Sequence, residues 1–164
     1  MLDHVFVWLS RLGTFGLVWI LIALALALLL RRPGLVVLVL AADGTADLLQ
    51  AAIKAVVDVD RPPVRYPEPK ALVHVPIGHS FPSGHAATSF ACATVLAYAF
   101  PRLAAPFYLL AAAIAFSRVY VGVHYPLDVI GGAILGIAVA AGLVFLGRRW
   151  LRGAGGHSES GTGL

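Results

Sequence analysis

The stretch SRVYVGVHYPLDVIGGAILGIAVAAGLVFL, residues 117–146, joins a polar motif to a long apolar run. Residues 127–146 are about as long as a helix that crosses a lipid bilayer, and Asp128 is their only charged residue. Arg118 closes the apolar segment before them, and His124 lies between the two segments. The stretch therefore predicts two membrane-spanning helices with a short polar connection at one side of the membrane.

The composition extends this prediction to the whole chain. The 164 residues are 60% hydrophobic and 12% charged, whereas soluble domains have about 45–50% apolar and about 25% charged residues. We therefore expect an all-α, polytopic transmembrane helix bundle in the cell membrane. The formal charge of +4 comes without a basic patch interleaved with aromatic residues, which argues against nucleic-acid binding.

Five apolar segments predict spans, and a shorter segment precedes them. We expect an N-terminal interfacial helix over residues 2–12 and a polar, Pro-rich extramembrane loop over residues 58–81. Residues 1–152 then form a single membrane-embedded domain, and the Gly/Ser-rich residues 153–164 are expected to be a disordered tail. The expected spans are residues 13–30, 35–57, 83–100, 103–120 and 127–146.

Two further motifs carry residues suited to binding a phosphate. Lys54 is followed, after six residues, by Arg61-Pro62, and the sequence PSGH at residues 82–85 opens the third span. With this order of spans, all three motifs fall on one side of the membrane. The residues brought to that side are Lys54, Arg61, Ser83, Gly84, His85, Arg118, His124 and Asp128.

The cations and the helix start at Ser83 match the needs of phosphoryl transfer. This reaction needs positive charge around the phosphoryl oxygens, and Lys54, Arg61 and Arg118 can supply it. Free N–H groups at the beginning of a helix form an anion site, and Gly84 allows the backbone to approach a ligand closely. Taken alone, Lys54 and Arg61 could equally be cations that snorkel at a helix end.

The two histidines can supply the nucleophile and the acid. His124 and Asp128 are four residues apart, so they lie close together if a helix starts near Pro126. A carboxylate on one ring nitrogen would fix the tautomer and leave the other nitrogen free to attack. His85 could protonate a departing oxygen. The simpler alternative is that Asp128 favours the helix N-terminus electrostatically and that His85 is an interfacial side chain.

In order and spacing, the three motifs resemble the signature of the type 2 phosphatidic acid phosphatase family, the lipid phosphate phosphatases, over roughly residues 34–146. The resemblance implies a membrane enzyme that needs no metal. It implies that His124 is a nucleophile forming a phosphohistidine, that Asp128 orients it and that His85 is the general acid. It also implies that the phosphate is bound by Lys54, Arg61, Ser83, Gly84 and Arg118.

No cofactor is expected from the residues either. The histidines at 74, 79, 85 and 124 are irregularly separated, which is not the spacing of metal ligands. The partner that we expect is a lipid phosphate substrate whose tail stays in the bilayer.

The substrate that we favour is undecaprenyl diphosphate, because a small single-domain enzyme with an outward-facing site suits envelope lipid recycling. Phosphatidic acid or phosphatidylglycerophosphate is the alternative. A small transporter or channel would explain the polar residues of the second span but not the three motifs. Haloperoxidase-like chemistry with vanadate is disfavoured, because such enzymes are larger and soluble.

The distribution of arginine predicts the orientation of the site. Cytoplasmic loops carry the excess of Lys and Arg. Apart from the motif cations, the site side has Arg11, Arg65 and Lys70. The site is therefore expected to face the extracytoplasmic side. The opposite side carries more positive charge, at Arg31, Arg32, Arg102, Arg148, Arg149 and Arg152.

A polar stripe in the second span allows two interpretations. Asp43, Asp47, Gln50 and Lys54 are spaced by four, three and four residues, which places them on one helix face. Carboxylates within a membrane are costly and face the bundle interior. They either form a polar track beneath the site or make interhelical hydrogen bonds that fix packing, and we favour packing.

Overall fold

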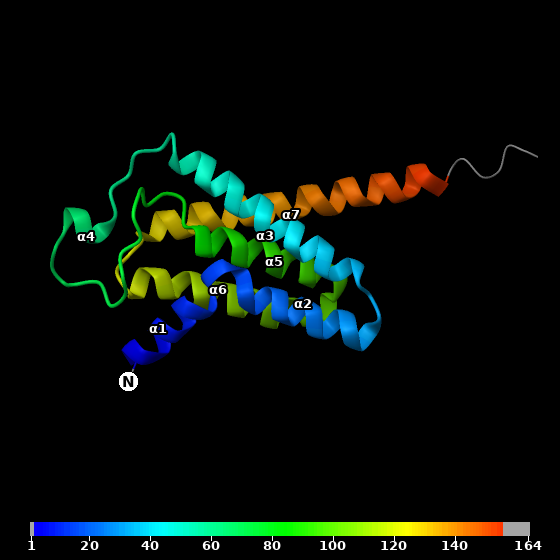
Figure 1. The fold of residues 1–164 in the computed structure, drawn as a ribbon, viewed down its shortest axis with the longest axis horizontal. Coiled ribbons are helices and arrows are strands. Elements are labelled where there is room, and N and C mark those ends of the chain that lie inside the picture. The colour runs from blue at the N-terminus through cyan, green and yellow to red at the C-terminus, as the bar shows by residue number, and fades with distance from the viewer. Residues whose placement is uncertain (1, 156–164) are drawn as a thin grey trace, which may run out of the picture.

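The computed structural model describes residues 2–155, of which residue 15 and residues 148–155 are described by their backbone alone. Within this range every regular element is a helix and none is a strand (Figure 1), so the predicted all-α fold is confirmed. The expected disordered tail lies outside the described residues apart from 153–155, where α7 ends. The elements are α1 (Leu2–Leu12), η1 (Thr14–Gly16), α2 (Leu17–Leu30), α3 (Gly34–Lys54), α4 (Pro62–Arg65), α5 (Gly84–Ala99), η2 (Pro101–Leu103), α6 (Ala104–Tyr120) and α7 (Pro126–Gly155).

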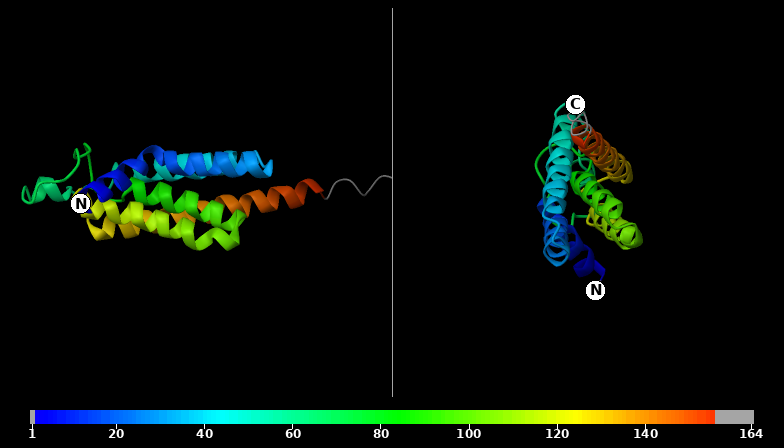
Figure 2. Two further views of the ribbon diagram at one scale, coloured as in Figure 1. Left: turned by 90° about the horizontal axis from the view of Figure 1, so that it is seen from below. Right: turned by 90° about the vertical axis from the view of Figure 1, so that its right-hand side faces the viewer.

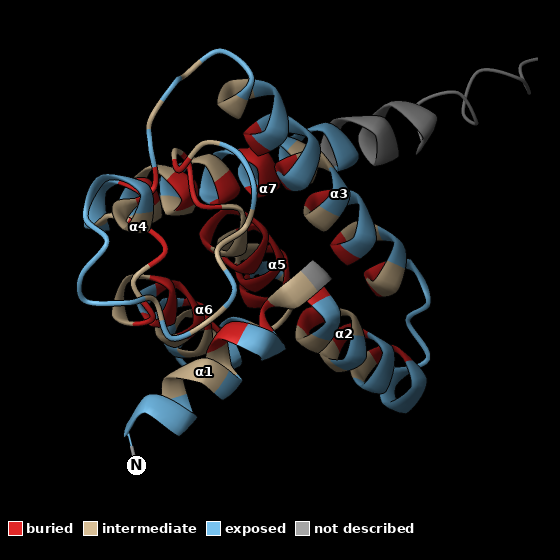
Figure 3. Cartoon of the chain, turned by 60° about the vertical axis from the view of Figure 1, so that its left-hand side comes forward, coloured by how far each residue is buried: buried red, intermediate tan, exposed pale blue. Residues whose placement is uncertain are grey.

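The long helices lie side by side along one axis, with α5 in the middle of the bundle (Figure 2). Small side chains allow α5 to approach its neighbours α3, α6 and α7 closely. Burial is concentrated on α5 and on the inward faces of the other helices (Figure 3). The buried residues of α5 are Ala86, Ala87, Thr88, Ser89, Ala91, Cys92, Ala93, Val95, Leu96 and Ala97.

Two glycines bring α7 against the backbone of α5. A Cβ atom added at Gly132 would lie 2.4 Å from the carbonyl oxygen of Ser83, and one at Gly136 would lie 2.1 Å from that of Ala87. Only a residue without a side chain fits these two places. The contact holds the first turns of α5 and α7 together, and two of the three motifs are located there.

By length and composition, three described helices can cross a membrane: Gly34–Lys54, Pro101–Tyr120 and Pro126–Gly147. The pair α1 and α2 passes the same test together, as a span broken by a bend of 65°. α5 has 16 residues, which corresponds to about 24 Å, so it is shorter than these helices although it is the central one. The multi-pass bundle is confirmed, but three or four spans meet the length criterion rather than the expected five.

The bend between α1 and α2 turns α1 toward the end of the bundle that holds the motifs (Figure 1). Gly16, the N-cap residue of α2, has φ of +62°, a left-handed conformation that glycine adopts without steric cost. Phe6 of α1 stacks on Tyr120 of α6, with ring centroids 4.1 Å apart. The helix that was expected to be only an interfacial lead-in therefore packs against the motif end.

The loop between α3 and α5, which contains α4, folds over the same end. The backbone N–H of Ser80 donates to the carbonyl of Val59 at 2.7 Å, which pairs the two ends of the loop. The N–H of Leu72 donates to the carbonyl of Val121, beyond the end of α6, at 3.0 Å. The loop is thus tied both to itself and to the segment that carries His124.

Candidate active site

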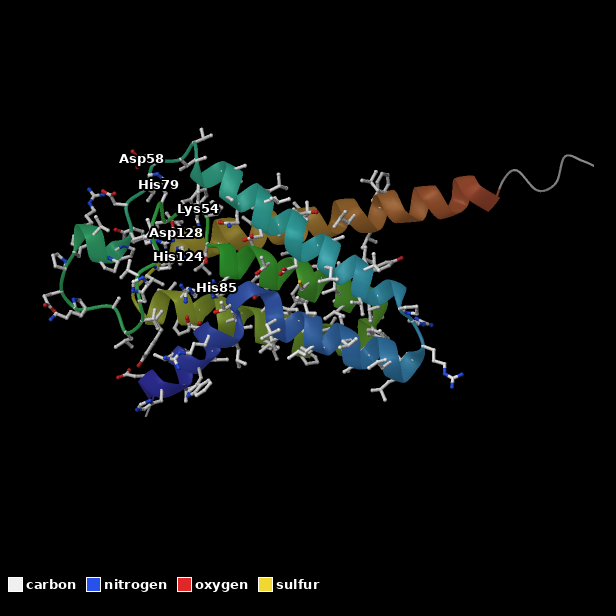
Figure 4. All side chains as sticks on the ribbon, in the orientation of Figure 1. Lys54, Asp58, His79, His85, His124 and Asp128 are labelled. Atoms are coloured by element: carbon white, nitrogen blue, oxygen red, sulfur yellow. The ribbon has the colours of Figure 1, made fainter. Side chains whose placement is uncertain are left out.

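The motif residues meet at one end of the bundle (Figure 4). α3 ends at Lys54, α5 begins at Gly84 and α7 begins at Pro126, so three helix ends converge there. The structure brings six of the eight predicted residues to one cavity of about 340 Å³, whereas Ser83 and Asp128 are buried and are not among its lining residues. The six that line it are Lys54, Arg61, Gly84, His85, Arg118 and His124.

His124 is held from both sides of its ring. Its Nδ1 lies 3.3 Å from Oδ2 of Asp128, and its Nε2 lies 3.1 Å from a terminal nitrogen of Arg61. A guanidinium can only donate hydrogen bonds, so Nε2 must accept and the ring proton belongs on Nδ1. This tautomer leaves the Nε2 lone pair on the cavity side, which is the arrangement that a nucleophilic histidine needs.

Asp128 is fixed in turn by two further donors. Its Oδ2 accepts the backbone N–H of Tyr125 at 2.8 Å and the hydroxyl of Ser80. Ser80 is fully buried and also lies 3.5 Å from Nδ1 of His124. Sequence reasoning missed Ser80, whose one signal is that it stands just before the PSGH motif.

Burial and charge both keep His124 neutral. Burial, the largest cause, lowers the pKa of His124 to about 4, and nearby Arg61 and Arg118 act in the same direction. The hydrogen bond that His124 donates to Asp128 opposes this shift. Nε2 therefore stays unprotonated from weakly acidic to neutral pH.

Arg61 lies in the loop rather than at the end of a span, because α3 ends at Lys54. It has extended dihedral angles of −71° and 152°, as Pro62 after it requires. The guanidinium donates to the carbonyls of Gly78 and Val123, each at 3.1 Å. Burial lowers the pKa of Arg61, which the carboxylate of Asp128 opposes.

His85 is held by the backbone of α1. Its Nε2 lies 3.1 Å from the carbonyl oxygen of Ser10. Since a carbonyl only accepts, Nε2 carries a proton and Nδ1 remains for proton exchange. The hydroxyl of Ser10 accepts a hydrogen bond from Arg118, so one residue of α1 touches two motif side chains. Sequence reasoning missed Ser10, a polar residue between Leu9 and Arg11 in the segment that was expected to be interfacial.

Several buried polar atoms have no hydrogen-bond partner within the described part of the chain. They include Oγ of Ser83, Nε of Arg118 and Oε1 of Gln50. Ser83 occupies the N-cap position of α5 as predicted, but its hydroxyl makes no capping bond. Buried polar atoms are nearly always paired in folded proteins, so those of Arg118 and Gln50, which line the cavity, suit hydrogen bonds to a ligand.

The polar stripe of α3 lines the same cavity. Asp43, Asp47 and Gln50 are among its lining residues, together with Thr14 and Thr88. Asp47 accepts a hydrogen bond from Gln50 at 3.0 Å, which is a contact within α3 and not between helices. Of the two carboxylates, Asp43 alone accepts a hydrogen bond from another helix within the described residues, from the thiol of Cys92 at 3.8 Å. The expected interhelical hydrogen bond is therefore not made by Asp47.

The remaining histidines of the loop lie apart from His124. His79 pairs with Asp58 at 2.9 Å near the protein surface (Figure 4). His74 lines a second cavity of about 530 Å³, which shares Thr14, Pro76, His85 and Arg118 with the first. Among residues 2–155, no group of three or more His, Cys, Asp or Glu side chains is placed to hold a metal ion.

Comparisons with known proteins agree with this geometry. The family model described as the PAP2 superfamily matches residues 16–152. The undecaprenyl-diphosphatase of Sulfolobus acidocaldarius is 32% identical over 137 residues, which are 82% of this chain and 66% of that protein.

Two bacterial proteins are similar to this chain as well. The decaprenylphosphoryl-5-phosphoribose phosphatase of Mycobacterium tuberculosis is 36% identical over 134 residues, which cover 81% of this chain and 73% of that protein. The crystal structure of a transmembrane PAP2-type phosphatidylglycerolphosphate phosphatase from Bacillus subtilis superimposes with a TM-score of 0.71 at 29% identity. That match covers 90% of this chain and 77% of the other.

Proposed function

This chain belongs to the PAP2 superfamily of membrane lipid phosphate phosphatases, and we propose from that premise that it hydrolyses a lipid phosphate through a phosphohistidine on His124. The observation that carries the proposal is the orientation of His124. Its Nδ1 faces Asp128, and its Nε2 faces Arg61 and the cavity. A nitrogen lone pair beside a guanidinium can accept a phosphoryl group whose oxygens that guanidinium binds.

In the first step, Nε2 of His124 attacks phosphorus and the bond to the lipid oxygen breaks. Lys54, Arg61 and Arg118 surround the phosphoryl oxygens with positive charge. His85 gives the leaving oxygen its proton. The imidazolium that forms on His124 is stabilised by Asp128.

In the second step, water attacks the phosphohistidine. His85 takes a proton from that water, the bond between phosphorus and Nε2 breaks, and inorganic phosphate is released. Neither step calls for a metal ion, because the three cations supply the charge.

The substrate that the sequence favours is undecaprenyl diphosphate, and the name of the archaeal relative supports it. Lipids that carry a phosphate on glycerol or on a sugar are the second candidates. The names of the Bacillus and Mycobacterium proteins support these.

The test is phosphate release by the purified protein in detergent. Undecaprenyl diphosphate, phosphatidic acid and phosphatidylglycerophosphate are compared at equal surface concentration, with and without EDTA. We expect at least one substrate to be hydrolysed at the same rate in EDTA. Activity that is lost in EDTA and restored by Mg²⁺ would contradict the mechanism, and no release from any of the three would contradict the function.

We also propose that the site faces the extracytoplasmic side. Arg31, Arg32 and Arg102 lie in the turns at the opposite end of the bundle, which agrees with the arginine bias of cytoplasmic loops. Cysteines placed at Arg65 and Arg102 in a Cys92→Ala background can be labelled with an impermeant reagent in intact cells. Labelling at position 65 alone is expected, and labelling at position 102 alone would invert the orientation.

A further inference from the structure

The active-site cavity has two chemically different ends. One end carries Lys54, Arg61, Arg118 and the two histidines, and the proposed function uses all of them. The other end is formed by the polar face of α3, with Asp43, Asp47 and Gln50. The proposed chemistry uses none of these three residues. Carboxylates in a membrane-spanning helix are costly, so their presence in the cavity requires an explanation.

The α3 end offers hydrogen-bond acceptors. The amide nitrogen of Gln50 donates to Asp47, which leaves the amide oxygen of Gln50 pointing elsewhere. That oxygen is buried and has no partner among the described residues, and Gln50 itself is only 8% exposed. An unpaired acceptor beside a carboxylate is stabilised by a ligand that brings donors.

Gln50 packs against the start of the helix that carries the proposed acid. A Cβ atom added at Gly84 would lie 3.2–3.4 Å from three side-chain atoms of Gln50, so the amide packs against the first residue of α5. His85, the proposed acid, follows Gly84 directly and lines the same cavity. A group attached close to the leaving oxygen can therefore reach Gln50 and Asp47.

We propose that Asp47 and Gln50, with Asp43 beyond them, form a subsite for a hydroxyl group that the lipid carries close to its phosphate ester. This inference rests on the proposed function and narrows its substrate to phosphomonoesters of polyol lipids, such as a glycerol or sugar headgroup. Hydroxyls can donate to Asp47 and Gln50 and accept from the hydroxyls of Thr14 and Thr88, which also line the cavity.

The carboxylates of Asp43 and Asp47 also disfavour undecaprenyl diphosphate, the substrate that the sequence favours. When the terminal phosphate of a diphosphate is held by the cations, its second phosphate is part of the leaving group. That phosphate would lie on the side of Asp43 and Asp47, where like charges repel. An uncharged hydroxyl meets no such repulsion.

The test uses two substrates that differ by a single hydroxyl. They are a 1-O-alkylglycerol 3-phosphate and its 2-deoxy analogue, a 3-alkoxypropyl phosphate with the same alkyl chain. We expect the wild-type protein to prefer the hydroxylated lipid by about tenfold in kcat/KM, and Asp47→Asn to bring this ratio close to one. Because each ratio is measured within one preparation, it does not depend on how much of a variant folds.

Asp3→Asn is the matched control, since Asp3 is an exposed carboxylate on α1 that accepts a hydrogen bond from Tyr120 and does not line the cavity. It should keep the wild-type ratio. Equal kcat/KM for both lipids in the wild type, or a preference that survives in Asp47→Asn, would overturn the subsite while leaving the phosphatase function intact. An analogue with an amino group in place of the hydroxyl forms the third arm. A higher kcat/KM for that analogue than for the alcohol would show that the subsite binds an ammonium group and not a hydroxyl.

Discussion

The surroundings of His124 and His85 differ although both side chains line one cavity. His124 lies in the connection before α7 and is held by three side chains, those of Arg61 and Ser80 from the loop after α3 and that of Asp128 from α7. His85 lies on the first turn of α5, and within the described part of the chain its ring is hydrogen-bonded to the backbone carbonyl of Ser10 alone. A nucleophile must have a fixed tautomer and direction, whereas a proton donor needs one exchangeable position. The difference in surroundings therefore matches the two proposed roles.

The largest effect is expected from replacing His124, the proposed nucleophile. His124→Ala should lower kcat by about 10⁴-fold or more and should abolish the covalent phosphoenzyme, because no other group replaces the attacking nitrogen. Quenching the enzyme during turnover with ³²P-labelled substrate measures the adduct, which should be acid-labile and comparatively base-stable. His4→Ala, at the exposed start of α1, is the control. Phosphate found on His85 in the wild type would show that the roles are reversed.

His85→Ala should affect the two steps unequally. With a lipid substrate, loss of the acid should lower kcat by about 10²- to 10⁴-fold. With p-nitrophenyl phosphate the leaving group needs little protonation, so the phosphohistidine should form and then accumulate, because no base activates water. Rapid-quench measurement of the adduct distinguishes this outcome from simple loss of the site. An adduct level below that of the wild type with the aryl phosphate would contradict the assignment.

The proposed role of His124 also predicts the protonation state of its ring. A lowered pKa of about 4, against 6.5 for an ordinary histidine, means that the ring stays neutral as pH falls and gains a proton only near pH 4. The nucleophile should therefore be competent throughout the range above that value. NMR of ¹⁵N-histidine-labelled protein, assigned with His124→Gln, should show a proton on Nδ1 and none on Nε2 at pH 6. Titration of this ring near pH 6.5 would contradict the prediction.

The smallest effect is expected from Ser80, which acts on His124 through Asp128. Ser80→Ala removes one hydrogen bond to a carboxylate, so kcat should fall by about tenfold while KM changes little. The Nδ1 proton signal of His124 should also broaden, which a merely structural role would not cause. Ser89→Ala is the matched buried control, because Ser89 bonds Trp19 within the core and lies outside the cavity. Equal loss of kcat in both variants would mean that Ser80 has no special role.

The class of fold and the grouping of the motifs were predictable from the sequence. An apolar run whose length as a helix is close to the thickness of a bilayer has few alternatives to a transmembrane helix. The reason is that backbone N–H and C=O groups without hydrogen bonds are too costly in lipid. Once the spans are placed, their ends are placed as well, and Lys54, His85, Arg118 and His124 fall on one side. The pair His124 and Asp128 was equally predictable, because four residues make one helical turn.

Contacts that depend on the path of loops and on helix bends were decided by the tertiary structure alone. Ser80 reaches Asp128 because the loop after α3 folds back and pairs Ser80 with Val59. Ser10 reaches His85 because α1 bends by 65° from α2. The stripe on α3 could be read from the sequence, but which neighbour it faces could not. Helical periodicity fixes which residues share a face, whereas the rotation of a helix in the bundle is set by the packing of all its neighbours.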